Sequence, residues 1–132
     1  MTGYISSVVL VAGGWNLVNG ILHDVFVLRS DHGKQYDRNL LRLLMDGHVL
    51  MTCGVNLLVV SVGIRSRHEY AYAVAAVALA SMIVYCFMIF PFLKSIVTLF
   101  INSVTLITLI LSFIKKIENE YDYNLRGHRE GG

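Results

Sequence analysis

WNLVNGILHDVFVLRSDHGKQYDRNLLRLLMDGHVLMT, residues 15–52, is the stretch that decides the fold. A short charged segment around Gly33 separates two apolar segments, and both continue beyond the stretch. A helix of about 20 predominantly apolar residues crosses the hydrocarbon core of a bilayer. The stretch therefore predicts a hairpin of two transmembrane helices, with Asp37 as the N-cap of the second helix.

Four ionisable side chains lie in this hairpin. His23 and Asp24 are near the end of the first apolar segment, and Asp46 and His48 are near the start of the second. An ionisable group at membrane depth costs about 2.5–3.5 kcal/mol on insertion scales, so it is rarely kept without a partner or a function. The four residues therefore predict a buried polar site near the turn.

The composition extends the membrane interpretation to the whole chain. The 132 residues are 55% hydrophobic and 15% charged, with a mean hydropathy of +0.60. Soluble domains have about 25% charged residues. We therefore predict an all-α, integral membrane bundle of four transmembrane helices, a multi-pass protein in contact with the lipid bilayer. The expected spans are about 4–28, 40–64, 70–90 and 92–114, in a transmembrane domain of residues 1–116.

The ends of the chain and of its third helix follow from local signals. No Lys or Arg precedes the first apolar run, so we interpret this run as a retained span and not as a secretory signal. Pro91 is expected to end the third helix, because proline lacks a backbone N–H and disfavours helical backbone before it. Residues 117–132 form a polar tail that is expected to stay helical for a turn or two.

Charge and cysteine content exclude some functions. A net charge of +2 without a basic patch argues against nucleic-acid binding. Cys53 and Cys86 lie within apolar segments, where cysteine behaves as a small buried hydrophobe. Six Lys and Arg residues lie on the side of the second loop and the tail, and five lie on the other side. The positive-inside rule then predicts that both termini face the cytoplasm.

Polar residues follow helical faces in all four spans. Asn16, Asn19 and His23 share one face of the first span, and Gly13 and Gly20 on the same side permit a neighbouring helix to come close. Trp15 is in mid-span and is expected to pack against protein or cofactor. The remaining polar positions, in the second, third and fourth spans, are Thr52, Asn56, Ser81, Tyr85, Thr98, Asn102 and Thr105.

The second span has two separate polar stripes. Arg38, Arg42 and Asp46 recur every four residues, so Arg42 and Asp46 are placed to pair. His48, Thr52 and Asn56 form the second stripe. Asp46 and His48 are two residues apart, and helix geometry places them roughly 200° apart around the axis. These two side chains therefore cannot serve the same point.

The asparagines near mid-depth have two interpretations. Asn16, Asn56 and Asn102 form interhelical hydrogen bonds, worth about 0.6 kcal/mol each on average. Alternatively, together with Tyr85, they line a hydrated or ligand-filled pocket along the bundle axis.

The histidines suggest a cofactor. His23 and His48 lie about 7 and 12 Å below the shared loop, so adjacent antiparallel helices can place them in one layer. Two imidazoles facing across a bundle core are what haem b ligation requires, and one suits a metal ion. The predicted ligands are His23 and His48, with a surrounding shell of Asn19, Asp24, Asp46 and Thr52.

Two further hypotheses use the same residues. The histidines and carboxylates suit proton transfer in a quinone site, in proton-coupled transport, or in acid–base chemistry on a lipophilic substrate, so whether the protein is an enzyme stays open. In the other hypothesis, Asp24 and Asp46 pair with Arg29 and Arg42 near the membrane surface, and the histidines only fill space. The protein is then a non-catalytic accessory subunit that packs against other membrane subunits or against itself.

Overall fold

The chain forms four α-helices in the computed structural model, which describes residues 2–89 and 96–130. These helices are α1 (Thr2–Arg29), α2 (Arg38–Arg65), α3 (Glu69–Ile89) and α4 (Ile96–Glu130), with a short 3-10 helix, η1 (Asp31–Lys34), between α1 and α2. The described residues contain no strand. The predicted all-α bundle of four helices is confirmed.

All four helices have segments long and apolar enough to cross a membrane: Gly3–Arg29, Arg38–Arg65, Glu69–Ile89 and Ile96–Asn119. The chain is therefore an integral, multi-pass membrane protein. The side on which the termini lie stays a prediction. Phe90, Pro91 and the expected start of the fourth span at residue 92 lie outside the described residues.

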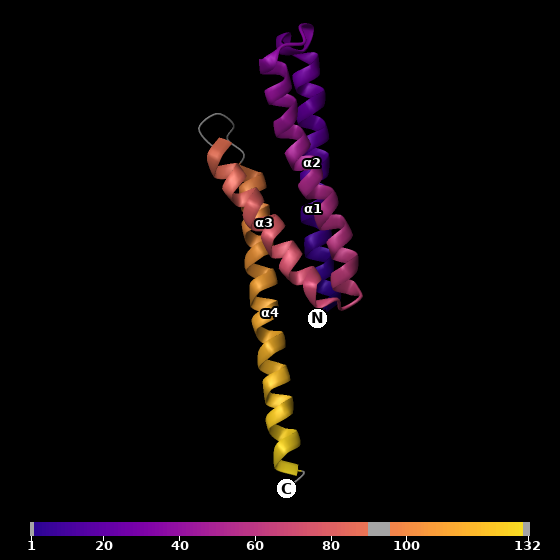
Figure 1. Ribbon diagram of the computed structural model, residues 1–132, viewed down its shortest axis with the longest axis vertical. Coiled ribbons are helices and arrows are strands. Elements are labelled where there is room, and N and C mark those ends of the chain that lie inside the picture. The colour runs from indigo at the N-terminus through magenta and orange to yellow at the C-terminus, as the bar shows by residue number, and fades with distance from the viewer. Residues whose placement is uncertain (1, 90–95, 131–132) are drawn as a thin grey trace.

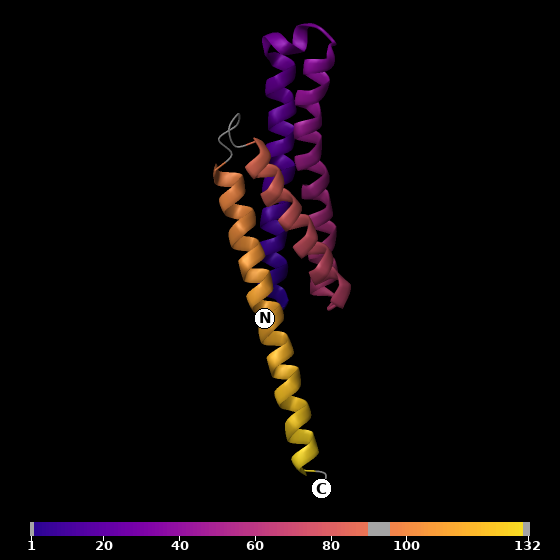
Figure 2. The same cartoon turned by 60° about the vertical axis from the view of Figure 1, so that its left-hand side comes forward.

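The helices pack as two pairs. Figure 1 shows α1 and α2 side by side along their whole length, with η1 at the end of the hairpin, and these two helices share the most extensive contact in the bundle. α3 and α4 form a second pair that leans against the hairpin. The end of α3 and the start of α4 lie beside the hairpin and short of η1 (Figures 1 and 2). Polar residues of α1 and α2 at this level therefore meet the end of α3.

Glycines on both helices set the close approach of the hairpin. A Cβ atom added to Gly20 would lie 2.6 Å from the carbonyl oxygen of Gly47, and one added to Gly13 would lie 3.0 Å from that of Gly54. Residue 20 is thus opposite residue 47, and residue 13 is opposite residue 54. The predicted role of Gly13 and Gly20 is confirmed. Their partners form a matching seven-residue repeat on α2, and small residues of this kind let the helix backbones touch.

Capping bonds define the ends of the helices near the hairpin turn. The backbone N–H of Leu40 donates to Asp37 Oδ1 at 2.8 Å, which confirms Asp37 as the N-cap of α2. Ser30 caps η1 by accepting a hydrogen bond from the N–H of His32 at 3.3 Å.

The core lies between the hairpin and the other pair of helices. Its fully buried side chains include Val9, Leu57, Leu79 and Leu109, one from each helix. Across α1 and α2, Ser6 Oγ donates to the carbonyl oxygen of Ser61 at 2.8 Å. Apolar packing and the Ser6–Ser61 bond thus hold the half of the bundle nearest the N-terminus, and the other hydrogen bonds from α1 side chains to other helices lie further along α1.

α4 extends beyond the bundle. It remains helical to Glu130, well past the turn or two expected for the tail, and Figure 1 shows this part running on alone below the other helices. Lys116 Nζ pairs with Glu69 Oε1 at 3.0 Å, so the start of α3 is level with the end of the apolar part of α4. The division of the chain into a domain of residues 1–116 and a tail of residues 117–132 stays a prediction.

Candidate ligand pocket

A cavity of about 320 Å³ lies where α3 ends and α4 begins, beside the middle of the α1–α2 hairpin. All four helices contribute to its wall. Three polar side chains on one face of α1 contribute to it, and α2, α3 and α4 add Asp46, Tyr85 and Thr98. The lining residues are Trp15, Asn19, His23, Asp46, Leu50, Tyr85, Cys86, Ile89, Val97 and Thr98.

Thr98 joins the α1 and α4 walls of the pocket. Its hydroxyl oxygen accepts hydrogen bonds from Trp15 Nε1 at 3.2 Å and from Asn19 Nδ2 at 3.1 Å. Thr98 is 3% exposed, so both donors bond to a hydroxyl oxygen that is buried between the helices. Trp15 thus contacts protein, as its mid-span position predicts. These two bonds hold the indole and the amide at the wall of the cavity.

Tyr85 brings an unsatisfied hydroxyl to the pocket from α3. Its oxygen is buried and has no hydrogen-bond partner within the described part of the chain. The hydroxyl lies near the carboxylate of Asp46 without the geometry of a hydrogen bond. A buried polar group left without a partner costs about 1–3 kcal/mol. Tyr85 and Asp46 therefore form a close polar pair at the wall of the pocket.

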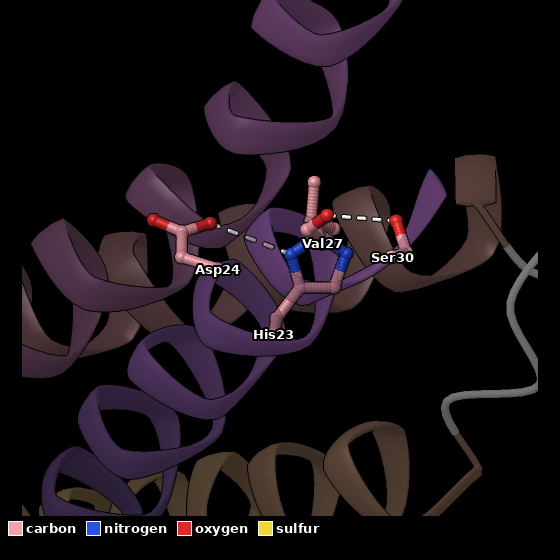
Figure 3. A network of polar contacts seen from close by, with 4 residues as sticks. All are labelled: His23, Asp24, Val27 and Ser30. Atoms are coloured by element: carbon pink, nitrogen blue, oxygen red, sulfur yellow. Dashed lines mark hydrogen bonds and ion pairs between the residues drawn. The ribbon is translucent and has the colours of Figure 1, made fainter. Parts of the chain in front are cut away.

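His23 and Asp24 form a pair at the α1 side of the pocket (Figure 3). His23 Nδ1 and Asp24 Oδ1 are 3.5 Å apart, and the two side chains are 15% and 20% exposed. Figure 3 shows Nδ1 turned toward the carboxylate and the other ring nitrogen on the far edge of the imidazole. The Asp24 side chain lies directly over Gly47, where α2 has no Cβ atom. A carboxylate on one ring nitrogen orients the imidazole for proton exchange through the other.

Neither carboxylate of the hairpin pairs with an arginine. Among the ion pairs of the described residues, none joins Asp24 to Arg29 or Asp46 to Arg42. Asp46 instead lines the same pocket as His23, and Arg42 is exposed. The hypothesis of two surface ion pairs is therefore wrong for these residues.

His48 lies on the other side of the hairpin. It is exposed and lines a separate groove with Asp24, Met45 and apolar residues of both helices. The helical period explains this position. Asp46 faces the pocket, and His48 is two residues further along α2, about 200° around the helix axis, so it faces away. The structure does not bring His23 and His48 to one point. The arrangement thus gives the bis-histidine haem hypothesis no support.

Metal binding finds no support either. Within residues 2–89 and 96–130, no group of three or more His, Cys, Asp or Glu side chains is placed to hold a metal ion. Met45 and His48 are exposed on the outer face of α2.

Of the three asparagines near mid-depth, Asn16 and Asn102 form the predicted interhelical hydrogen bonds, and Asn56 neither forms one with any described residue nor lines the pocket. Asn16 and Asn102 are fully buried and exchange hydrogen bonds, with Nδ2 of Asn16 donating at 2.9 Å and Nδ2 of Asn102 donating at 3.1 Å. Asn102 Nδ2 also donates to the carbonyl oxygen of Thr98 at 2.8 Å. These two residues join α1 to α4 and do not line the pocket. Asn56, with Thr52, is exposed on the outer face of α2.

The pocket therefore gathers four of the predicted site residues, Asn19, His23, Asp46 and Tyr85. Sequence reasoning placed Thr98 on a polar stripe but did not assign it to the site. Only the pairing of α4 with α1 shows its role, and that pairing joins residues about 80 positions apart. Comparison of the chain with protein-family models, with curated proteins and with solved structures gives no match.

Proposed function

We propose that the protein binds a lipophilic molecule with a small hydrogen-bonding head group, of the quinone class, in the pocket between the hairpin and the end of α3. The observation that supports this proposal is the polar wall at Tyr85 and Asp46: both residues line a cavity of about 320 Å³, and the buried Tyr85 hydroxyl lies beside the Asp46 carboxylate without a well-formed hydrogen bond to any described residue. Buried polar groups in proteins are almost always hydrogen-bonded, and a bound ligand is one way in which such a group is satisfied.

The chemistry of the wall suits a quinone head group. Tyr85 offers a donor, Asp46 an acceptor, and His23 either, so the wall can bind the carbonyl oxygens of a quinone or the hydroxyls of a quinol. Leu50, Ile89 and Val97 line the apolar part. The volume is at the lower end of small-molecule pockets, which are about 300–1,000 Å³. This space suits a single ring, with its apolar tail extending into the surrounding lipid.

His23 is the group that would exchange a proton with the ligand. An imidazole can both donate and accept a proton, and the Asp24 carboxylate, 3.5 Å from Nδ1, orients the ring. Asp46 and Tyr85 would hold the head group through hydrogen bonds. The protein would then serve as a ligand-binding and proton-exchanging component of a redox or proton-coupled membrane complex.

The alternative role of accessory subunit rests on a different part of the molecule. The outer face of α2 exposes His48, Thr52 and Asn56 within a membrane span, which favours contact with another membrane protein chain. Such a role does not account for the unpaired hydroxyl of Tyr85.

Trp15 provides a direct test of the binding proposal. It is the one tryptophan in the sequence and it lines the pocket, so a bound quinone would quench the intrinsic fluorescence. The protein in lipid nanodiscs is titrated with decylubiquinone, and free N-acetyltryptophanamide with empty nanodiscs corrects for collisional quenching. We expect saturable quenching for the native chain. Quenching that stays linear, as for the free indole, contradicts the proposal.

A variant pair locates the binding. Tyr85→Phe removes only the hydroxyl and is expected to weaken the apparent affinity by roughly two- to twelvefold, the value of one hydrogen bond of about 0.5–1.5 kcal/mol. Tyr72→Phe is the control, because Tyr72 lies on the same helix, is 6% exposed and lines a different pocket. Equal affinities for the two variants would place the quinone elsewhere.

A further inference from the structure

The outer face of α2 carries polar side chains that nothing in the bundle satisfies. His48, Thr52 and Asn56 recur at intervals of four residues, and all three are exposed. Around them, Met45 is 60% exposed, Val55 48% and Val59 67%. The opposite face of α2, with Gly47, Leu50, Gly54 and Leu57, is buried against α1 and the core. We call the first three residues the α2 polar stripe.

The side chains of the stripe make no hydrogen bond to any described residue. Hydroxyl groups elsewhere in the bundle do: Thr105 and Thr108 of α4 donate to carbonyl oxygens one turn earlier, and Ser61 on the buried face of α2 donates to that of Leu58. No bond of this kind involves His48, Thr52 or Asn56. The stripe therefore keeps its full set of donors and acceptors for a partner.

The stripe lies at the depth where lipid is least able to replace a partner. The membrane span of α2 is Arg38–Arg65, so Thr52 is at its middle. From residue 48 to residue 56 the helix rises about 12 Å, within a hydrocarbon core of roughly 30 Å. Lipid chains offer no hydrogen bonds, and an unsatisfied polar group there costs several kcal/mol. An exposed stripe at this depth indicates a surface that another protein covers.

We propose that this surface is covered by a second copy of the same chain, so that the protein is a parallel homodimer packed along α2. In a parallel dimer, a two-fold axis along the membrane normal places each residue opposite its own equivalent at the same depth. His48 then faces His48, Thr52 faces Thr52, and Asn56 faces Asn56. The parallel arrangement thus brings the three polar positions of one copy to the depth of the same three positions of the other.

The chemistry of the stripe is self-complementary. A neutral imidazole, a hydroxyl and a carboxamide each have both a donor and an acceptor, so each satisfies a copy of itself. Thr52 and Asn56 are uncharged, so these positions in two copies do not repel each other. The bundle already contains such a pair: Asn16 and Asn102 exchange two hydrogen bonds between helices. Thr52 and Asn56 line neither the pocket nor the groove that His48 shares with Asp24, so variants at these two positions test the dimer separately from the proposed function.

Disulfide cross-linking in native-like vesicles tests the contact. In a Cys53→Ala, Cys86→Ala background, single variants Thr52→Cys and Asn56→Cys are oxidised with copper phenanthroline. Val11→Cys is the matched control, because the glycine register places residue 11 opposite residue 56 at the same depth and Val11 is 64% exposed on α1. We expect dimers from the two α2 variants and none above background from Val11→Cys. Equal cross-linking at all three positions contradicts the proposal.

Energy transfer between labelled copies provides a measurement that needs no cysteine in the interface. The full chain, labelled at its N-terminus, is diluted with lipid, and transfer is followed as a function of the protein-to-lipid ratio. We expect a reversible monomer–dimer equilibrium. Asn56→Leu should weaken it by roughly three- to tenfold, and Asn56→Leu combined with Thr52→Val by more. Asn56→Gln, which keeps the amide, should weaken it least.

Two results would overturn the proposal. One is a native chain that stays monomeric at every dilution, in which case a different protein covers the stripe. The other is a dimer that Asn56→Leu and Thr52→Val leave unchanged, in which case the copies meet elsewhere. The helix content and thermal unfolding of the same samples, followed by circular dichroism, show independently that the variants are folded.

Discussion

The inner and outer faces of α2 place similar side chains in opposite surroundings. On the inner face, Asp46 lines a pocket with His23 and Tyr85. On the outer face, His48 is exposed, and with Thr52 and Asn56 it makes no hydrogen bond to the described residues. Two positions along a helix separate the two environments. Equal depth in a membrane is therefore not evidence that two polar side chains share a site.

The close contact between α1 and α2 fixes which face of α2 is buried. Variants that disturb this contact should therefore have the largest effect on stability. In Gly20→Ala the new Cβ atom would lie 2.6 Å from the carbonyl oxygen of Gly47 and 2.8 Å from the backbone nitrogen of Met51. Backbone atoms cannot move aside cheaply, so we expect a loss of about 1–3 kcal/mol in unfolding free energy. Thermal unfolding followed by circular dichroism in detergent measures it.

Gly14→Ala is the matched control for that variant. It is on the same helix, and a Cβ atom there has no neighbour within 4 Å. Alanine is favoured over glycine in helices by about 1 kcal/mol, so this variant should be as stable as the native chain or more so. If both variants lose the same stability, close packing of the hairpin is not what the glycines provide.

The next largest effect on stability is expected at the buried pair of Asn16 and Asn102. These amides bond to each other inside the bundle, whereas the side chains of the α2 polar stripe are exposed. Asn102→Leu leaves the Asn16 amide buried without its partner, which should cost about 1–3 kcal/mol. The double variant Asn16→Leu, Asn102→Leu removes both polar groups and should recover most of that loss. A double-mutant cycle on unfolding in detergent gives the coupling, and a coupling near zero would mean that the pair does not form.

The two histidines give a direct comparison of the two faces. His23→Ala is expected to weaken decylubiquinone binding by roughly two- to twelvefold, as for the loss of one hydrogen bond. His48→Ala should leave binding within about twofold, because His48 lines the separate groove. Trp15 quenching measures both. A larger loss in His48→Ala would reverse the assignment of the faces.

The smallest effect is expected at the end of the bundle. Lys116→Ala removes the ion pair with Glu69, whose members are 42% and 80% exposed. Exposed pairs contribute about 0–1 kcal/mol, and salt screens them. We expect a change in unfolding free energy of less than about 0.5 kcal/mol that disappears in high salt. A larger and salt-independent loss would show that this contact positions α4 against α3.

The outcome of the sequence-based predictions depends on how local each signal is. Asp37 as a cap, and Gly13 and Gly20 as positions of close approach, were predicted because helix starts and small-residue faces are encoded within a few turns. The partner glycines on α2 were not identified, because residues 13 and 54 meet only through the hairpin register. Asn16 had two interpretations, and only its contact with Asn102, 86 positions away, decides between them.

The sequence by itself determined four apolar helices that span a membrane, because length and hydropathy are properties of each segment alone. It also determined that Asp46 and His48 face apart, because the helical period leaves no choice. The tertiary structure alone decided which side chains meet: His23 with Asp24, Tyr85 with the pocket, and Thr98 with Trp15. The physical reason is that helix rotation and register are set by packing between segments far apart in the chain, which no local pattern records.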